Sequence, residues 1–192
     1  MKGGESMDIL EIMKKRRSIR FYSQEQIKKE ELDKILEAGL WAPNAGSRQA
    51  VKFVVVQDKE LNEKLGKINR KIFGKARIAN DQSGSIASDD SIQNAFYNAP
   101  TVVYLFAPNN YPNSIQDCCV ASQNMMLEAC ALDIGSIYIA RGEKTFESEL
   151  GKECMAKWGL TDEYQCHSII PLGYALKEGQ PHSRKEDRVI FD

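Results

Sequence analysis

The segment of residues 114–135, SIQDCCVASQNMMLEACALDIG, constrains the fold more than any other part of the chain. It is the longest run with a helical pattern, and its side chains are mostly small or apolar. That composition predicts a helix that is buried nearly all round, and Gly135 is predicted to end it. Such a helix has to be wrapped by other elements, and a single domain of 192 residues is large enough to do this.

Four short apolar runs predict the strands of a sheet. They cover residues 51–58, 99–108, 136–140 and 165–175. Because these runs alternate with helical patterns, we expect an α/β or α+β layered domain in which helices wrap the sheet. The order of the strands stays open at this point.

Amphipathic patterns predict the first two helices. Residues 7–17 form a short one, and a stronger pattern begins at Glu30 or Glu31. Ser23 is a candidate N-cap upstream of the stronger pattern, which ends before Pro43.

Two further helices are predicted over residues 59–73 and 146–159. Between them, residues 74–90 are rich in Ser, Asp, Asn and Gly, which predicts a loop or a mobile lid. We expect this loop or lid region to extend over residues 74–94.

A dense cationic cluster lies at the end of the first predicted helix, in the segment KKRRSIRFYS of residues 14–23. The chain as a whole is balanced, with 26 Lys and Arg against 27 Asp and Glu and a net charge of −1. Nucleic-acid-binding domains are usually strongly basic, so this balance disfavours a nucleic-acid partner. The cluster can be a solvated helix end, or it can be a phosphate clamp made of Arg16, Arg17, Ser18 and Arg20.

Two loops carry polar groups that allow either a plain or a functional interpretation. The loop WAPNAGSRQ, residues 41–49, is made of turn formers, and its short polar side chains also suit the edge of a flat heterocycle. The segment PHSRK, residues 181–185, reads as a solvated tail unless Arg184 and Lys185 serve a site.

Several other chemistries are disfavoured by the pattern of residues. The five cysteines have no C-x-x-C spacing and only His167 and His182 could join them, so we expect no metal site. The Rossmann fingerprint, the P-loop and the serine nucleophile elbow are missing. Cys166 and His167 are neighbours in a predicted strand and should point to opposite faces. With no signal peptide and no apolar run of membrane-spanning length, we expect reduced thiols, a cytoplasmic protein and no membrane.

In their order along the chain, several of these segments resemble the FMN-dependent nitroreductase family. The matching segments are RRSIRFYS, ILEAGLWAPNAGSRQAVKFVVV, NAPTVVYLF, CVASQNMMLEACALDIGS, and PLGYA followed by SRK. The resemblance covers nearly the whole chain. It implies a single α+β domain over residues 1–192, with a central, mostly antiparallel sheet flanked by helices, in an interwoven homodimer that binds two FMN molecules at its interface.

The resemblance also implies roles for individual residues. The first arginine-rich segment would contact the FMN phosphate and the pyrimidine edge of the flavin, the loop after Trp41 would reach the flavin of the other subunit, and basic residues near the C-terminus would close the phosphate site. Backbone groups around Arg141 would lie near the reactive nitrogen of the flavin. The cofactor-binding residues so implied are Arg16, Arg17, Ser18, Arg20, Pro43, Asn44, Ala45, Ser47, Gln49, Asn94, Ala140, Arg141, Gly142, Arg184 and Lys185.

The activity implied by the resemblance is ping-pong hydride transfer from NADH or NADPH, through FMN, to a nitroaromatic, a quinone or a similar small acceptor. No side chain has to act as a nucleophile in such a reaction, because the cofactor carries the chemistry. Two alternatives stay open. The same fold can serve dehalogenation, flavin turnover or redox sensing, and a cofactor-free module could use the basic N-terminal segment to bind an acidic partner.

Overall fold

The computed structural model describes residues 8–75, 89, 91–181 and 183–192. The helices are α1 (Ile9–Lys15), α2 (Lys29–Leu40), α3 (Lys59–Lys75), α4 (Ser114–Ala131), α5 (Gly142–Phe146) and α6 (Glu149–Lys157), with a short 3-10 turn η1 (Ala45–Ser47). The strands are β1 (Lys52–Val56), β2 (Thr101–Pro108), β3 (Ile134–Ser136) and β4 (Tyr164–Tyr174).

The strands form an antiparallel sheet in the order β1-β2-β4-β3. Tyr104 in the centre of β2 pairs with Val54 of β1 on one side and with Ile169 of β4 on the other. The pairing of β2 with β4 shifts between Leu105 and Phe106. An antiparallel sheet with helices around it confirms the α+β class.

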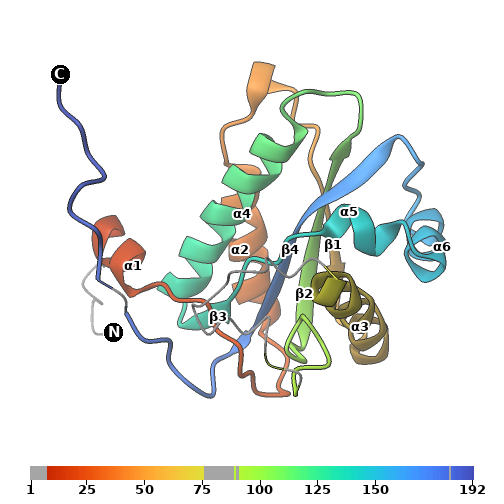
Figure 1. Cartoon of the computed structure of the whole chain (residues 1–192), viewed down its shortest axis with the longest axis horizontal. Coiled ribbons are helices and arrows are strands. Elements are labelled where there is room, and N and C mark those ends of the chain that lie inside the picture. The colour runs from red at the N-terminus through yellow and green to blue at the C-terminus, as the bar shows by residue number, and fades with distance from the viewer. Residues whose placement is uncertain (1–7, 76–88, 90, 182) are drawn as a thin grey trace.

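Helices cover both faces of the sheet (Figure 1). On one face α2 and α4 pack together against alternate residues of β2 and β4, and on the other face α3, α5 and α6 pack against the intervening residues. The two buried clusters contain Val103, Leu105, Met125, Ile170 and Leu172 on the first face, and Val102, Tyr104, Phe106, Phe146 and Ile169 on the second. Strands that are apolar on both faces are expected where helices cover both.

Helix α4 is less enclosed than the sequence predicts. Its residues that face α2 and the sheet are buried, but Ile115 and Val120 are 57% and 37% exposed. The prediction of burial nearly all round is therefore wrong for the single chain, because neighbouring elements cover only one side of this helix.

The end of α4 also differs from the prediction. The helix ends at Ala131, Leu132 is its C-cap, and Asp133 adopts the left-handed conformation at φ 57°. Gly135 does not stop the helix but lies in β3, where it pairs with Gly173. A Cβ at Gly135 would come within 2.9 Å of the Ile19 side chain, so the glycine allows a close approach of two segments.

Three other sequence-based boundaries need correction. The strand predicted over residues 136–140 begins and ends earlier in the structure, as β3 (Ile134–Ser136). Of the later residues, Ile139 forms a single bridge with Ile169. The helix predicted over residues 146–159 is α6, which begins later because Ser148 caps it by accepting the N–H of Gly151, and the separate short helix α5 precedes it. The structure shows no N-cap role for Ser23, since α2 begins only after Lys28.

The predicted lid cannot be compared with the structure over most of its length. Helix α3 extends to Lys75, and residues 76–88 and 90 lie outside the described residues. In the described ranges, no helix combines the length and the apolar character that a membrane crossing requires.

Candidate functional site

The N-terminal basic segment is joined to the sheet by backbone hydrogen bonds. Ile19 donates its N–H to the carbonyl of Ser136 at 3.0 Å, and Ser18 forms a parallel bridge with the same residue. Farther on, Tyr22 forms an antiparallel bridge with Ala175. The arginine-rich segment therefore runs along the edge of the sheet where β3 and the end of β4 lie.

A cleft of about 450 Å³ opens beside this segment. Arg16 and Arg17 line it, together with Ser136 of β3 and Gly179 of the C-terminal segment. The C-terminal segment is close to Arg17, because a Cβ at Gly179 would lie 2.5 Å from the Cβ of Arg17. Figure 1 shows the same relationship, with the C-terminal tail passing α1. The two ends of the chain thus build one cleft.

Three basic side chains, Lys15, Arg16 and Arg17, line this cleft together with the acidic Asp133 and Glu178. Burial lowers the pKa of Arg16, and the charges of Arg17 and Arg184 lower it further. Arg17 is held in place by two hydrogen bonds of 2.6 Å, to the carbonyls of Lys14 and Arg16. Half-buried like charges of this kind favour an anion between them, because a shared anion relieves both their repulsion and their desolvation.

A second cleft, of about 800 Å³, lies next to Arg20 and is also lined by Asn94, Tyr97 and Lys67. The Arg20 guanidinium sits 6.0 Å from the centre of the Tyr97 ring. Its Nε is buried and has no hydrogen-bond partner among the described residues. A buried donor without a partner is costly, which makes Arg20 a candidate for binding an acceptor group.

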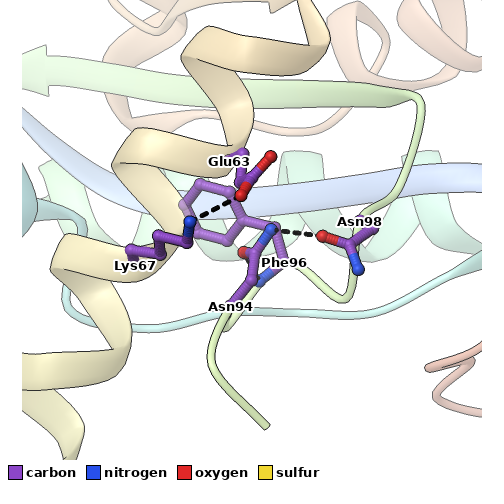
Figure 2. Close-up of polar contacts among 5 residues, drawn as sticks. All are labelled: Glu63, Lys67, Asn94, Phe96 and Asn98. Carbon is purple, nitrogen blue, oxygen red and sulfur yellow. Dashed lines mark hydrogen bonds and ion pairs between the residues drawn. The ribbon is translucent and has the colours of Figure 1, made fainter.

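Asn94 has a structural role in the wall of this second cleft. Its Oδ1 accepts the N–H of Phe96 at 2.8 Å, and its Nδ2 donates to Oδ1 of Asn98 at 2.9 Å (Figure 2). Nearby, Lys67 on α3 forms an ion pair with Glu63 at 2.6 Å (Figure 2). An asparagine amide has two donor hydrogens, and the bond to Asn98 uses one of them.

The loop of residues 43–49 lies elsewhere in the chain. Its Pro43, Asn44 and Gln49 line a pocket of about 240 Å³ next to Asp117 in the first part of α4. The first cleft reaches Cys130 near the other end of α4. Thirteen residues of helix separate the two positions, which is roughly 20 Å. One chain therefore does not bring this loop together with the arginines.

The backbone of this loop adopts an unusual conformation, which hydrogen bonds from its own side chains and from α4 stabilise. Gly46, Ser47 and Gln49 all have positive φ, between 49° and 62°. Asn44 stabilises the loop by accepting the N–H of Gln49 at 2.8 Å through its side chain. The N–H of Ala45 is bound by Asp117, whose other carboxylate oxygen is buried without a hydrogen-bond partner among the described residues.

The turn of residues Ala140–Gly142 precedes and opens α5. Arg141 has φ 65°, in the left-handed region that non-glycine residues rarely adopt. Burial lowers the pKa of its guanidinium, and Glu143 opposes this shift. The buried Asn69 of α3 donates a hydrogen bond to the carbonyl of Ala140 at 3.0 Å.

The structure thus distributes the predicted residues over four places. Arg16 and Arg17 line one cleft, and Arg20 and Asn94 share the neighbouring one. Arg184 and Lys185 are both exposed in the tail, where the charge of Arg184 helps to lower the pKa of Arg16. The loop of residues 43–49 and the turn at Arg141 form the other two places. Sequence reasoning missed Asp117 and Asn69, because their contacts depend on the tertiary fold.

A family model and two curated relatives match most of this chain. A family model described as the Nitroreductase family matches residues 13–174. A protein of Archaeoglobus fulgidus named putative NADH dehydrogenase/NAD(P)H nitroreductase is 29% identical over 173 residues, covering 89% of this chain and 87% of the relative. A relative of the same name from Methanothermobacter thermautotrophicus is 28% identical over 190 residues, covering 97% of this chain and 84% of the relative.

A solved structure is similar over nearly the full length. A nitroreductase with bound FMN from Desulfitobacterium hafniense superposes with a TM-score of 0.82 at 25% identity, covering 97% of this chain and 100% of the other. The architecture of that protein is therefore shared by this chain.

Proposed function

The chain belongs to the nitroreductase family, and we propose that it is an FMN-dependent oxidoreductase that uses NADH or NADPH to reduce a small organic acceptor. One observation carries the proposal. The N-terminal segment at Arg16 and Arg17 and the C-terminal segment at Gly179 line one cleft, and a Cβ at Gly179 would lie 2.5 Å from the Cβ of Arg17. Nitroaromatics and quinones are the acceptor class that we propose, and relatives named NAD(P)H nitroreductases support it.

The residues present fit FMN. Its phosphate carries close to two negative charges, and the partly buried Arg16 and Arg17, together with the exposed Arg184, can neutralise them. The unpartnered Nε of Arg20 fits a carbonyl oxygen at the pyrimidine edge of the flavin. Asn94, in the same cleft, can add a donor to that edge.

When bound, FMN supplies the group that takes up and releases a hydride. The chain binds and orients the cofactor: Arg16, Arg17 and Arg184 hold the anionic end, and Arg20 places a positive charge near the ring. That charge stabilises negative charge that develops during reduction. We propose no nucleophilic role for a side chain, and burial raises the pKa of the Cys118 thiol to about 12, which keeps it in its unreactive protonated form.

We propose that the active form is a homodimer. The loop of residues 43–49 lies roughly 20 Å from the arginines within one chain, so it can act at a flavin only if a second copy presents it. Apolar side chains next to the loop are exposed in the single chain, including Leu40 at 66%, Trp41 at 79% and Ile115 at 57%. Exposed apolar groups of this kind mark protein interfaces.

We also propose a cytoplasmic location and no nucleic-acid partner. All five cysteines are free, which suits a reducing compartment. The net charge of −1 suits a small anionic cofactor better than a polynucleotide.

The test is an absorbance spectrum of the protein purified from flavin-replete cells. We expect the two flavin bands in the visible region, bleaching on anaerobic addition of NADH or NADPH, and their return when an acceptor is added. A colourless protein that takes up no FMN would contradict the proposal. A panel of nitroaromatic, quinone and halogenated acceptors distinguishes nitroreduction from the alternatives of dehalogenation, flavin turnover and redox sensing.

A further inference from the structure

We infer that Asn69 is a positioning residue of the flavin site: its side-chain amide fixes the backbone of the turn Ala140–Gly142. The inference rests on the proposed function and on the family resemblance, which implies that backbone groups of this turn lie near the reactive nitrogen of the flavin. Asn69 itself lies on α3, 71 residues earlier in the chain than the carbonyl that it binds.

Hydrogen bonds engage two successive carbonyls of the turn. Asn69 is 1% exposed, and its Nδ2 donates to the carbonyl of Ala140 at 3.0 Å and to Oγ1 of Thr145 at 2.9 Å. Thr145 in turn donates its hydroxyl at 2.9 Å and its backbone N–H at 3.1 Å to the carbonyl of Arg141. Both hydrogens of the Asn69 amide are therefore used to hold the turn.

The turn is also fixed from the side of β4. Ile139 exchanges two backbone hydrogen bonds with Ile169, of 2.9 and 3.1 Å. A Cβ at Gly142 would lie 2.6 Å from the carbonyl oxygen of Cys166, so the backbone of the turn is pressed against the strand. The left-handed conformation of Arg141, at φ 65°, persists because contacts with α3, α5 and β4 all determine it.

These hydrogen bonds fix the directions of the peptide C=O and N–H groups in the turn. In a trans peptide unit the C=O and the N–H point in opposite directions. The carbonyls of Ala140 and Arg141 are bound by Asn69 and Thr145, so the N–H groups of Arg141 and Gly142 point away from those partners. Oriented N–H groups stabilise negative charge. The more negative, reduced form of the cofactor should therefore be stabilised as long as Asn69 holds the turn.

The experiment compares Asn69→Leu with Asn62→Leu in the FMN-loaded protein. Asn62 is a matched control on the same helix: it is 3% exposed, donates to the carbonyl of Val56 at 2.9 Å and accepts the hydroxyl of Tyr104 at 2.9 Å. Both substitutions remove a buried amide of similar size, but only one of them releases the turn.

The flavin reduction potential is measured by equilibration with a reference dye, and unfolding is followed in urea. We expect both variants to lose stability. Only Asn69→Leu should change the ratio of the affinities for reduced and oxidised FMN, by about tenfold, which lowers the potential by about 30 mV for a two-electron couple. Equal potentials in the wild type and Asn69→Leu would overturn the inference.

A milder pair decides the question if Asn69→Leu does not fold. Thr145→Val removes the hydroxyl that connects Asn69 to the carbonyl of Arg141, and Thr145→Ser keeps it. We expect a lowered potential for the valine variant and the wild-type potential for the serine variant, and equal potentials for the two would overturn the inference. A wild-type protein that takes up no FMN would instead contradict the proposed function, and the inference with it.

Discussion

Asp117 and Tyr111 hold the backbone of Ala45 from both sides: the carboxylate accepts its N–H at 3.1 Å and the tyrosine hydroxyl donates to its carbonyl at 2.8 Å. Both residues belong to the segment that leads into α4 or to its first turns. The Arg48 guanidinium lies over the Tyr111 ring, 4.7 Å from its centre, and adds a third contact to the loop. The loop that is expected to reach a flavin in a second subunit is thus preformed by its own chain.

From this contact we predict that Asp117→Ala weakens FMN binding by about tenfold, because a hydrogen bond to a charged group contributes about 1.5–3 kcal/mol to the order of the loop. Asp117→Asn keeps an oxygen that can accept the N–H of Ala45 and should bind FMN nearly as well as the wild type. Quenching of flavin fluorescence during titration measures both. Equal losses in the two variants would show that the charge of Asp117, and not its support of the loop, matters.

The cleft at Arg16 leads to a prediction about the cofactor phosphate. Arg16→Ala and Arg184→Ala should each raise the dissociation constant for FMN by about 10- to 100-fold, because charge-assisted hydrogen bonds contribute about 1.5–3 kcal/mol. Lys14→Ala is the control, since Lys14 is exposed and its amine is paired with Glu11 at 2.8 Å.

Riboflavin, which has no phosphate, provides a second control for the same prediction. Its affinity should be nearly the same in the wild type and in Arg16→Ala. If both substitutions leave FMN occupancy unchanged in a folded protein, Arg16 and Arg184 do not form the phosphate site.

The sequence predicts the parts of the fold that depend on local pattern. The runs at 99–108 and 165–175 are apolar on both faces, and they form the central strands β2 and β4. The end of α4 could not be predicted in this way, because the left-handed position is taken by Asp133 and not by a glycine. The short strand β3 is defined by pairing with residues near Gly173, which no local pattern shows.

The candidate site also contains some residues that the local sequence predicts and others that only the tertiary structure shows. The arginine cluster stands out in the sequence because its members lie within five residues of one another. Asp117 binds a residue 72 positions away, and Asn69 binds one 71 positions away. Each is one of several polar residues in its helical pattern, so only the tertiary structure shows that it supports a turn.

The backbone strain at Arg141 predicts a difference in stability between two substitutions. A non-glycine residue in the left-handed region costs about 1–2 kcal/mol, and glycine does not have this cost. Arg141→Gly and Arg141→Ala both remove the guanidinium, so its contacts cancel in the comparison. We expect the glycine variant to be more stable by about 1 kcal/mol in urea unfolding of the FMN-free protein.

Gly159 provides a reference for the difference in stability between glycine and alanine at a positive φ. It has φ 69°, and a Cβ there would meet nothing within 4 Å. Gly159→Ala should therefore lose about 1 kcal/mol for the same conformational reason. A difference between glycine and alanine that appears at position 159 but not at 141 would show that the turn relaxes when the arginine side chain is removed.

The burial of His167 predicts a specific pH dependence of stability. Burial lowers the pKa of its imidazole below the ordinary value of 6.5, and Glu143 opposes the shift only in part. Its Nε2 is buried and has no hydrogen-bond partner within the described part of the chain, which agrees with a neutral ring. As the pH falls below 6.5, the unfolded chain binds a proton at this residue and the folded chain does not.

The free energy of unfolding should therefore decrease as the pH is lowered from 6.5 toward the lower folded-state pKa of His167, and should not depend on this residue above that window. His167→Gln removes the titrating group and should flatten this part of the pH profile. Urea unfolding at pH 7.5, 6.5 and 5.5 measures the slope, and all other titrating groups are shared by the two proteins. Parallel profiles for the wild type and His167→Gln would mean that His167 binds a proton in the folded state as readily as in the unfolded chain.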